Sequence, residues 1–326
     1  MKILVITLNN IGDVLLTLPS IQFLRHRFPS AKISVVVGER ASSLLLQDPR
    51  YEKVWVDRKK IRFAKRLSLF GELARQRFDL VINFRDLFSS MLSGDIKNVF
   101  NKKFWKPRKR KLHRKERHFE HLIRLGIAEI AQLNRLETDD ALWISEDCQK
   151  RMRELLKQEG VSEEGGWILV APGSLSFTKR WPVEKFIQLC NTLVKERSAH
   201  ILLVGEEQDR LMSQKIAQVV SSNGLTDLCG RTDLLGLAYL VKKAGILITH
   251  DSAPLHMASL LGTPVVAIFG PTNPEKYGPW RENSQMIRKE FFCSPCEKSL
   301  CVYHHECMER IEPQEVMEAV RKLVKV

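Results

Sequence analysis

The sequence predicts an α/β protein made of two Rossmann-like, doubly wound parallel-sheet domains. Short β-branched apolar runs alternate with longer amphipathic stretches from one end of the chain to the other. The runs are apolar along nearly their whole length, which is typical of parallel strands covered by helices on both faces. With 326 residues, the chain is too long for one ordinary core and suits two domains of roughly 100–200 residues each.

The predicted strands form two series, separated by a region in which this alternation fades. That region runs from about 126 to 166, and we place the boundary near residue 160, between domains 1–160 and 161–326. The expected strands are residues 2–8, 32–37, 53–56, 79–83 and 96–100, then 167–171, 200–204, 246–249 and 265–269. The expected helices are residues 14–27, 64–76, 183–197, 208–222, 233–243 and 253–261, with a charged helix at 146–159 before the boundary. A last amphipathic helix at 313–326 could pack back across the first domain.

The amino end of the chain indicates a buried strand that runs into a loop. The apolar run Ile3–Leu8 is short and polar residues follow it at once, which argues against an export signal. Gly12 permits a tight turn, and Asp13 opens the next helix. An acid at a helix start usually caps the helix. The alternative is a catalytic carboxylate that takes a proton from a sugar hydroxyl within hydrogen-bond reach.

The net charge of +14 is concentrated in two basic patches of the first domain. Residues 58–66 hold six Lys and Arg and no acid, and residues 101–118 hold ten Lys and Arg against one acid, so the rest of the chain is close to neutral. Such patches predict an anionic partner, which could be nucleic acid, anionic lipid or an acidic substrate, although a solvated charged face has the same pattern. Phe63, Phe104 and Trp105 are too few to stack nucleic-acid bases, so we expect no nucleic-acid partner.

The segment 171–182, APGSLSFTKRWP, has residue types that bind phosphate. A buried strand opens into Gly173, which permits close backbone approach, and Ser174 and Thr178 offer hydroxyls. Lys179 adds a point charge. The spacing is not that of a Walker loop, so this segment alone is weak evidence.

The segment 249–264, THDSAPLHMASLLGTP, begins a helix directly after a strand. Ser252 is a good N-cap, Pro254 suits the first turn and Gly262 can end the helix. The free N–H groups of this helix start form an anion site at the carboxyl end of a strand, where doubly wound folds bind ligands. Asp251 would repel phosphate, so we expect it to fix the loop by accepting backbone N–H bonds. The simpler interpretation of the segment is an ordinary capped helix.

Two further segments of the second domain are candidates for nucleoside binding. Glu206 and Asp209 follow a strand, where an acid commonly holds ribose hydroxyls, although a solvated surface explains each equally well. Thr232 stands with Asp233 at a helix start that could border a base.

Four of the seven cysteines lie in one short segment, residues 293–307. The cluster consists of Cys293, Cys296, Cys301 and Cys307. A structural Zn²⁺ site, an iron–sulfur cluster, a disulfide, free thiols and a catalytic thiol all remain open. A zinc knuckle usually shows two tight Cys pairs, and only one pair here is tight.

Taken together, these segments resemble the bacterial ADP-heptose:lipopolysaccharide heptosyltransferases, glycosyltransferase family 9. The resemblance rests on GDVLLTLPSIQFLRHRFP, APGSLSFTKRWP, the Cys-rich tail and above all THDSAPLHMASLLGTPVVAIFGPTNP, in this order along nearly the whole chain. It implies a GT-B fold, in which two Rossmann-like domains face a cleft. The donor nucleotide would lie on the second domain and the acceptor on the first.

The resemblance also assigns residues. Asp13 matches the general base and Lys179, with Ser174 nearby, matches the lysine that holds the donor pyrophosphate. Asp209 falls at the acid for the ribose, and Thr232 falls near the adenine pocket. The phosphate loop matches Asp251, Ser252, Ala253 and His256. The chain departs from the family at two positions: Ser89 replaces the usual arginine, and Ala253 stands where glycine is common.

The expected function is therefore an inverting transfer of heptose from ADP-heptose to the inner core of lipopolysaccharide. Lys179 and the helix start at Ser252 would stabilise the departing ADP, so no metal need be obligatory. Basic side chains would bind the anionic lipid A–Kdo acceptor at the cytoplasmic face of the inner membrane. The acceptor-binding candidates are Lys60, Arg62, Arg85, Arg114 and Arg117, with Gly12, Thr178 and Glu206 added on the donor side. The alternatives are another nucleotide sugar, a sensor without turnover, or a basic nucleic-acid-binding protein with a Cys-rich metal module.

Overall fold

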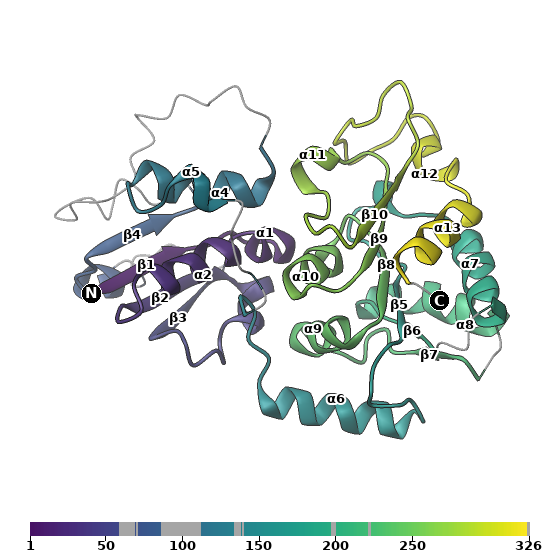
Figure 1. Cartoon of the computed structure of the whole chain (residues 1–326), viewed down its shortest axis with the longest axis horizontal. Coiled ribbons are helices and arrows are strands. Elements are labelled where there is room, and N and C mark those ends of the chain that lie inside the picture. Colours follow the sequence, from purple (N-terminus) through teal and green to yellow (C-terminus); the bar gives the residue numbers. More distant parts are fainter. Residues whose placement is uncertain are drawn as a thin grey trace. The chain divides into compact units, whose positions relative to one another are not determined.

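A computed structural model describes residues 1–58, 69, 71–85, 112–133, 138, 140–196, 200–220 and 223–324. The expected strand at 96–100, and Lys60 and Arg62 of the first basic patch, lie outside the described residues. The chain divides into two compact units, unit 1 from Met1 to Trp143 and unit 2 from Ile144 to Val326. Both are layered α/β structures (Figure 1), which confirms the predicted fold class.

Unit 1 is built on a four-stranded sheet of order β3-β2-β1-β4 in which every pair is parallel. The strands are β1 (Lys2–Ile6), β2 (Lys32–Gly38), β3 (Lys53–Asp57) and β4 (Leu80–Asn83). The helices are α1 (Ile11–Leu15), α2 (Leu18–Arg27), η1 (Glu39–Leu44), α4 (Arg114–Arg124) and α5 (Ile130–Leu133). Phe23 of α2 meets Phe119 of α4 edge to face, with ring centroids 5.0 Å apart.

The helix expected at 14–27 is two helices in the structure. The break falls at Leu16 and Thr17, where the Thr17 hydroxyl donates to the Val14 carbonyl over 2.6 Å. Pro19 occupies the first turn of α2, where it lacks an N–H to continue the α1 hydrogen bonds.

Unit 2 is built on a six-stranded, all-parallel sheet of order β10-β9-β8-β5-β6-β7. The strands are β5 (Ile168–Ala171), β6 (Ile201–Leu203), β7 (Leu225–Asp227), β8 (Ile246–His250), β9 (Val265–Phe269) and β10 (Ser284–Arg288). The edge strands β7 and β10 were not predicted. Both are only half-buried and carry polar residues, so neither forms an apolar run.

Helices cover both faces of the unit 2 sheet (Figure 1). On one face α9 (Leu234–Lys243) packs on α10 (Ala253–Leu261), and on the other α7 (Val183–Glu196) packs on α8 (Arg210–Val220) and α13 (Pro313–Leu323). The short helices are η3 (Phe177–Lys179), η4 (Glu207–Asp209), α11 (Pro274–Tyr277) and α12 (Glu306–Glu309). The predicted helices at 183–197, 233–243 and 253–261 are thus confirmed to within a residue or two.

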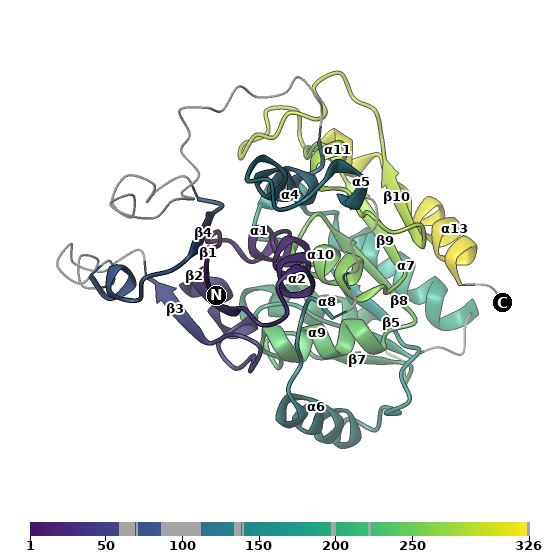
Figure 2. The ribbon, with the colours of Figure 1, turned by 60° about the vertical axis from the view of Figure 1, so that its left-hand side comes forward.

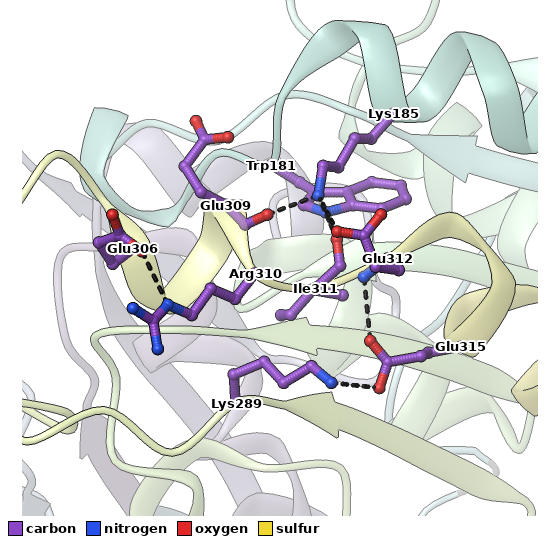
Figure 3. Close-up of polar contacts among 9 residues, drawn as sticks. All are labelled: Trp181, Lys185, Lys289, Glu306, Glu309, Arg310, Ile311, Glu312 and Glu315. Carbon is purple, nitrogen blue, oxygen red and sulfur yellow. Dashed lines mark hydrogen bonds and ion pairs between the residues drawn. The ribbon is translucent and has the colours of Figure 1, made fainter.

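The carboxyl-terminal helix packs on its own unit, and the expectation that it returns to the first domain was wrong. Figure 2 shows α13 beside β10, and Arg321 of α13 pairs with Glu196 of α7 over 2.6 Å. Figure 3 shows how the preceding turn is fastened: the Lys185 ammonium donates to the Glu309 and Ile311 carbonyls and to Glu312, at 2.5, 2.9 and 2.9 Å. These bonds fix the direction in which α13 leaves α12.

The division at residue 144 lies before α6 (Glu146–Gln158), whereas the boundary expected near 160 lies after it. The helix packs on α9 of unit 2. Arg151 pairs with Asp233 over 2.7 Å, and Met152 lies so close to Gly236 that a Cβ there would be 2.7 Å from its sulfur. A helix with weak sequence alternation is thus held to the second unit by contacts that the local pattern does not reveal.

Candidate functional site

The two loops expected to bind phosphate leave adjacent strands at the centre of the unit 2 sheet. From β5 the chain continues to β6 and β7 on one side, and it then returns to lay β8, β9 and β10 on the other. The connections after β5 and β8 therefore diverge at their carboxyl ends. This is the topological switch point at which doubly wound sheets bind ligands.

Lys179 and Asp251 meet at this switch point. The Lys179 ammonium lies 2.5 Å from a carboxylate oxygen of Asp251, whose side chain is buried while that of Lys179 is about one-third exposed. His256 Nε2 lies 3.8 Å from the other oxygen of Asp251, and its ring is stacked near that of Trp280. The loop-fixing role expected of Asp251 thus acts in the structure through a cation rather than through backbone N–H groups.

Ser252 is the N-cap of α10, as predicted, but its hydroxyl does not cap the helix. It bonds Thr249 Oγ1 at 3.1 Å and the His250 carbonyl at 3.4 Å. The first N–H groups of α10, beginning at Ala253, therefore have no side-chain cap and remain suited to an anion. Gly262 ends the helix in a left-handed conformation with φ of 77°, as predicted.

The hydroxyls of the loop between β5 and α7 are partly engaged within the protein. Thr178 is buried, shares a 3.0 Å bond with Ser176 and donates to the Lys298 carbonyl over 3.3 Å. Ser174 is buried as well, and its carbonyl accepts from Arg180 Nε over 2.8 Å. Thr178 thus connects the Cys-rich segment to this loop. The donor-binding roles of Ser174 and Thr178 stay predictions.

His250 was missed by the sequence reasoning, yet it joins both ends of this loop. Its ring is fully buried at the end of β8. Nε2 accepts the Trp181 backbone N–H over 2.9 Å, and Nδ1 faces the Gly173 carbonyl at 3.4 Å. Burial lowers the pKa of His250 to about 4, so the ring is neutral near pH 7 with its proton on Nδ1. The only feature of the sequence that could have indicated this role is the position of His250 directly before Asp251.

Lowering the pH is expected to decrease the stability of the folded protein through His250. Because the pKa of His250 falls from 6.5 to about 4 on folding, the unfolded chain takes up the proton first, and stability decreases as pH drops from 6.5 toward 4. Between pH 6.5 and 5 the loss should be about 2 kcal/mol for this group. Urea unfolding of the His250→Gln variant should show a smaller decrease over that interval. His118 of unit 1, whose pKa burial lowers to about 3, retains its own contribution in both proteins.

The two acids proposed for the ribose have different surroundings. Asp209 is buried, accepts the Glu206 backbone N–H over 3.1 Å and lies against Gly173, where a Cβ would be 2.2 Å from its Cγ. Glu206 is exposed in the loop after β6, where its carboxylate accepts the Asp209 backbone N–H and the Gln208 side-chain amide, the latter over 2.9 Å. Asp209 thus contacts two loops while Glu206 is more exposed to solvent, and the ribose-binding role of both acids stays a prediction.

Their substitutions should separate these roles. Glu206→Ala is expected to raise the KM for the nucleotide donor by about tenfold, the cost of one or two hydrogen bonds. It should lower thermal stability less than Asp209→Ala does, because Glu206 caps η4 from an exposed position. Asp209→Ala should lower the unfolding temperature, because it leaves the buried loop contacts unsatisfied. Thermal unfolding and donor KM of both variants test this. A stable Asp209→Ala protein with weakened donor binding would reverse the assignment.

Thr232 lies half-buried directly before α9, at the carboxyl side of the sheet. Its neighbour Asp233 caps α9 by accepting the Gly236 N–H over 2.7 Å, as expected of a helix start. The base-binding role of Thr232 stays a prediction.

Unit 1 has its own switch point, between β1 and β4. Asp13 is half-buried in the first turn of α1, after Gly12, and accepts a 2.9 Å bond from Asn10 Nδ2. The carboxylate is thus oriented by a side chain from the loop after β1 and remains partly accessible.

Arg85 is less accessible than expected of an acceptor-binding residue. Its side chain is buried, pairs with the buried Asp57 carboxylate and donates to the Leu8 carbonyl over 3.0 Å. As placed, it joins the carboxyl ends of β1, β3 and β4. Arg114 is half-buried and Arg117 is exposed on α4, so these two remain candidates for contact with an anionic acceptor.

The four clustered cysteines are free thiols in the structure. Among the described residues, which include the whole Cys-rich segment, no three His, Cys, Asp or Glu side chains are grouped so that they could hold a metal ion. Cys293, Cys296 and Cys301 all act electrostatically on Cys307, so the four thiols lie in one region, and a structural Zn²⁺ there stays a prediction.

The family model for glycosyltransferase family 9 (heptosyltransferase) matches residues 66–306. The chain is similar to lipooligosaccharide heptosyltransferase 2 of Campylobacter jejuni, with 25% identity over 328 residues and 99% of each chain covered. It is also similar to lipopolysaccharide heptosyltransferase 3 of Escherichia coli K12, with 28% identity over 290 residues and 83% of each chain covered.

Solved structures share the fold. A family 9 glycosyl transferase from Veillonella parvula superposes with a TM-score of 0.83 at 24% identity, covering 99% of this chain and 96% of that one. The ADP-heptose lps heptosyltransferase II of Escherichia coli gives 0.73 at 23% identity, covering 99% and 98%. These likenesses confirm the GT-B type of fold expected from the sequence.

Proposed function

The chain belongs to glycosyltransferase family 9, the heptosyltransferase family, and on this premise we propose that it transfers heptose from ADP-heptose to the inner core of lipopolysaccharide. The observation that carries the proposal is the switch point of unit 2. There a partly exposed ammonium and an uncapped helix start converge on the position where a doubly wound sheet binds a nucleotide.

In this proposal the donor diphosphate lies between Lys179 and the first N–H groups of α10. Lys179 carries a positive charge and the helix start carries a positive partial charge. They stabilise the diphosphate and the additional negative charge that develops on its leaving oxygen as the glycosidic bond breaks. Glu206 receives the ribose and Thr232 borders the adenine. His250 holds the loop of Lys179 in place, and Asp251 pairs with the lysine until the phosphates bind.

Unit 1 supplies the acceptor side. Asp13 takes the proton of the acceptor hydroxyl as that oxygen attacks the anomeric carbon, and the configuration inverts because a single displacement occurs. Arg114 and Arg117, with the basic residues near 58–66, bind the carboxylates and phosphates of lipid A–Kdo. The reaction then takes place at the cytoplasmic face of the inner membrane, to which the enzyme binds peripherally. No helix among the described residues is long and apolar enough to cross a bilayer.

The test is mass spectrometry of a lipid A–Kdo acceptor after incubation with a panel of ADP- and UDP-sugars. A mass increase of one heptose with ADP-heptose alone supports the proposal. An increase with a different nucleotide sugar would support the alternative, a transferase of the same fold for another glycan. No increase with any donor, despite nucleotide binding, would indicate a sensor.

A further inference from the structure

Exposed apolar side chains gather on two segments of unit 2, near residues 175–177 and 292–303. Among the described residues, eleven large apolar side chains are exposed, and six of them belong to these two segments. They are Leu175, Phe177, Phe292, Leu300, Val302 and Tyr303, with exposed fractions between 42% and 81%. We call them the apolar loop surface. A cluster of this kind marks a surface that meets another apolar phase, whereas scattered apolar residues need no explanation.

The two segments form one surface because they touch each other. The Phe177 ring meets the His305 ring edge to face at a centroid distance of 5.1 Å, and Thr178 donates to the Lys298 carbonyl over 3.3 Å. Phe292 and Tyr303 lie edge to face at 4.7 Å. The loop that carries Lys179 and the Cys-rich loop therefore present their apolar side chains together.

The Cys-rich loop directs its apolar residues outward. Cys296 and Cys301 are half-buried, whereas Leu300 and Val302 are 81% and 76% exposed. A loop stabilised by its own core would bury the larger aliphatic side chains in preference to small thiols. The outward placement leaves substantial apolar area in contact with water, so covering this area from outside would be favourable.

The loop carries little net charge, which permits contact with a headgroup region. Residues 291–305 contain one carboxylate, Glu297, and the Lys276 ammonium neutralises it over 2.5 Å. The adjoining Glu306 is paired with Arg310 over 2.7 Å (Figure 3). Lys298 is exposed beside the apolar residues. Glu290, which directly precedes this stretch, is exposed, so the loop presents one carboxylate at its start and the Lys298 ammonium beside its apolar residues. That ammonium is available to headgroup phosphates.

We infer that the apolar loop surface docks unit 2 on an anionic phospholipid bilayer, with its side chains entering the headgroup region. The inference rests on the proposed function, in which the acceptor is a membrane lipid and the donor must be brought to it. Phe177 stands two residues before Lys179, so docking through this surface holds the phosphate-binding loop at the bilayer. Aromatic side chains such as Phe292 and Tyr303 suit the interface between headgroups and acyl chains.

The test is flotation of the full-length protein with vesicles of phosphatidylethanolamine and phosphatidylglycerol. The variant replaces Phe292, Leu300 and Val302 by serine, all outside the phosphate-binding loop. We expect its vesicle partition coefficient to fall by about tenfold or more, since the lost side chains would have left water. The matched control replaces Leu211 and Val219 of α8, which are 77% and 58% exposed on the same unit, and should bind as the parent protein does. If thermal unfolding shows the triple variant to be damaged, Leu300→Ser alone carries the same test.

Turnover separates this inference from the proposed function. With a deacylated, water-soluble acceptor the triple variant should match the parent, and with an acceptor embedded in vesicles it should be slower. Failure of the parent protein on both acceptors would refute the proposed function but leave the flotation result standing. Equal flotation of variant and parent would overturn the inference. So would a change from oligomer to monomer in the variant without loss of vesicle binding, since that would show a second copy of the chain covering the surface.

Discussion

Replacing Asp13 by asparagine is expected to lower turnover by about 10²–10⁴-fold, the usual contribution of a positioned general base, while affinity for ADP-heptose stays within about twofold. Asparagine keeps the shape of the side chain and loses only the ability to take a proton. The carboxylate is suited to that task because it is half-buried and oriented by Asn10 Nδ2 at 2.9 Å. Single-turnover rates and donor titration by calorimetry measure the two quantities.

The control for this substitution is Asn10→Ala, which removes the orienting bond and leaves the carboxylate. It should cost about tenfold in rate or less, because the base is still present but less well placed. Asp13→Asn also removes an acid from the first turn of α1, which weakens the helix by about 0.3–1 kcal/mol. Thermal unfolding of both variants therefore accompanies the rate measurements. If Asp13→Asn turns over normally, the carboxylate serves only the start of α1.

Much of the fold could be predicted because the central strands are recognisable in the sequence as apolar runs. β1, β2, β5, β8 and β9 are covered on both faces, so their sequences are continuous apolar runs. The edge strands β7 and β10 have one free side and polar residues, and without their neighbours they do not differ from loops. The helix at 146–159 was expected, but its assignment to the second unit was not, because that assignment depends on contacts with α9, which is distant in sequence.

The candidate site was predicted in part for a similar reason. The residues at strand ends and helix starts could be found, because parallel strands bring all their carboxyl ends to one edge. The sequence pattern does not show which of these side chains are accessible to a ligand. Asp209 and Arg85 have the residue types of ligand-binding groups, and only the structure shows that both are buried and paired within the protein, Asp209 with Arg180 and Arg85 with Asp57. His250 shows the converse, since only its contacts with residues 69 and 77 positions away reveal its role.

Replacing Lys179 by alanine is expected to weaken ADP binding by about 10–100-fold, because a charge-assisted hydrogen bond to phosphate contributes about 1.5–3 kcal/mol. Calorimetric titration of the parent and variant with ADP measures this. Part of the loss would be indirect. Asp251 is buried, and removing its partner leaves an unpaired carboxylate beside the phosphates, which costs stability and repels the ligand.

The double variant Lys179→Ala/Asp251→Asn resolves the two contributions. Asp251→Asn alone should bind ADP more tightly than the parent by several-fold, since a phosphate oxygen then meets an ammonium that no carboxylate holds at 2.5 Å. Combining it with Lys179→Ala should recover part of the affinity that the single Lys179 variant loses, because no unpaired buried charge remains. The non-additivity of the cycle gives the coupling between the two side chains. If Asp251→Asn instead weakens ADP binding as much as Lys179→Ala does, the ion pair places the lysine for the phosphate, and competition between carboxylate and phosphate is of little importance. The same titrations therefore decide whether Asp251 opposes the leaving group or prepares the site for it.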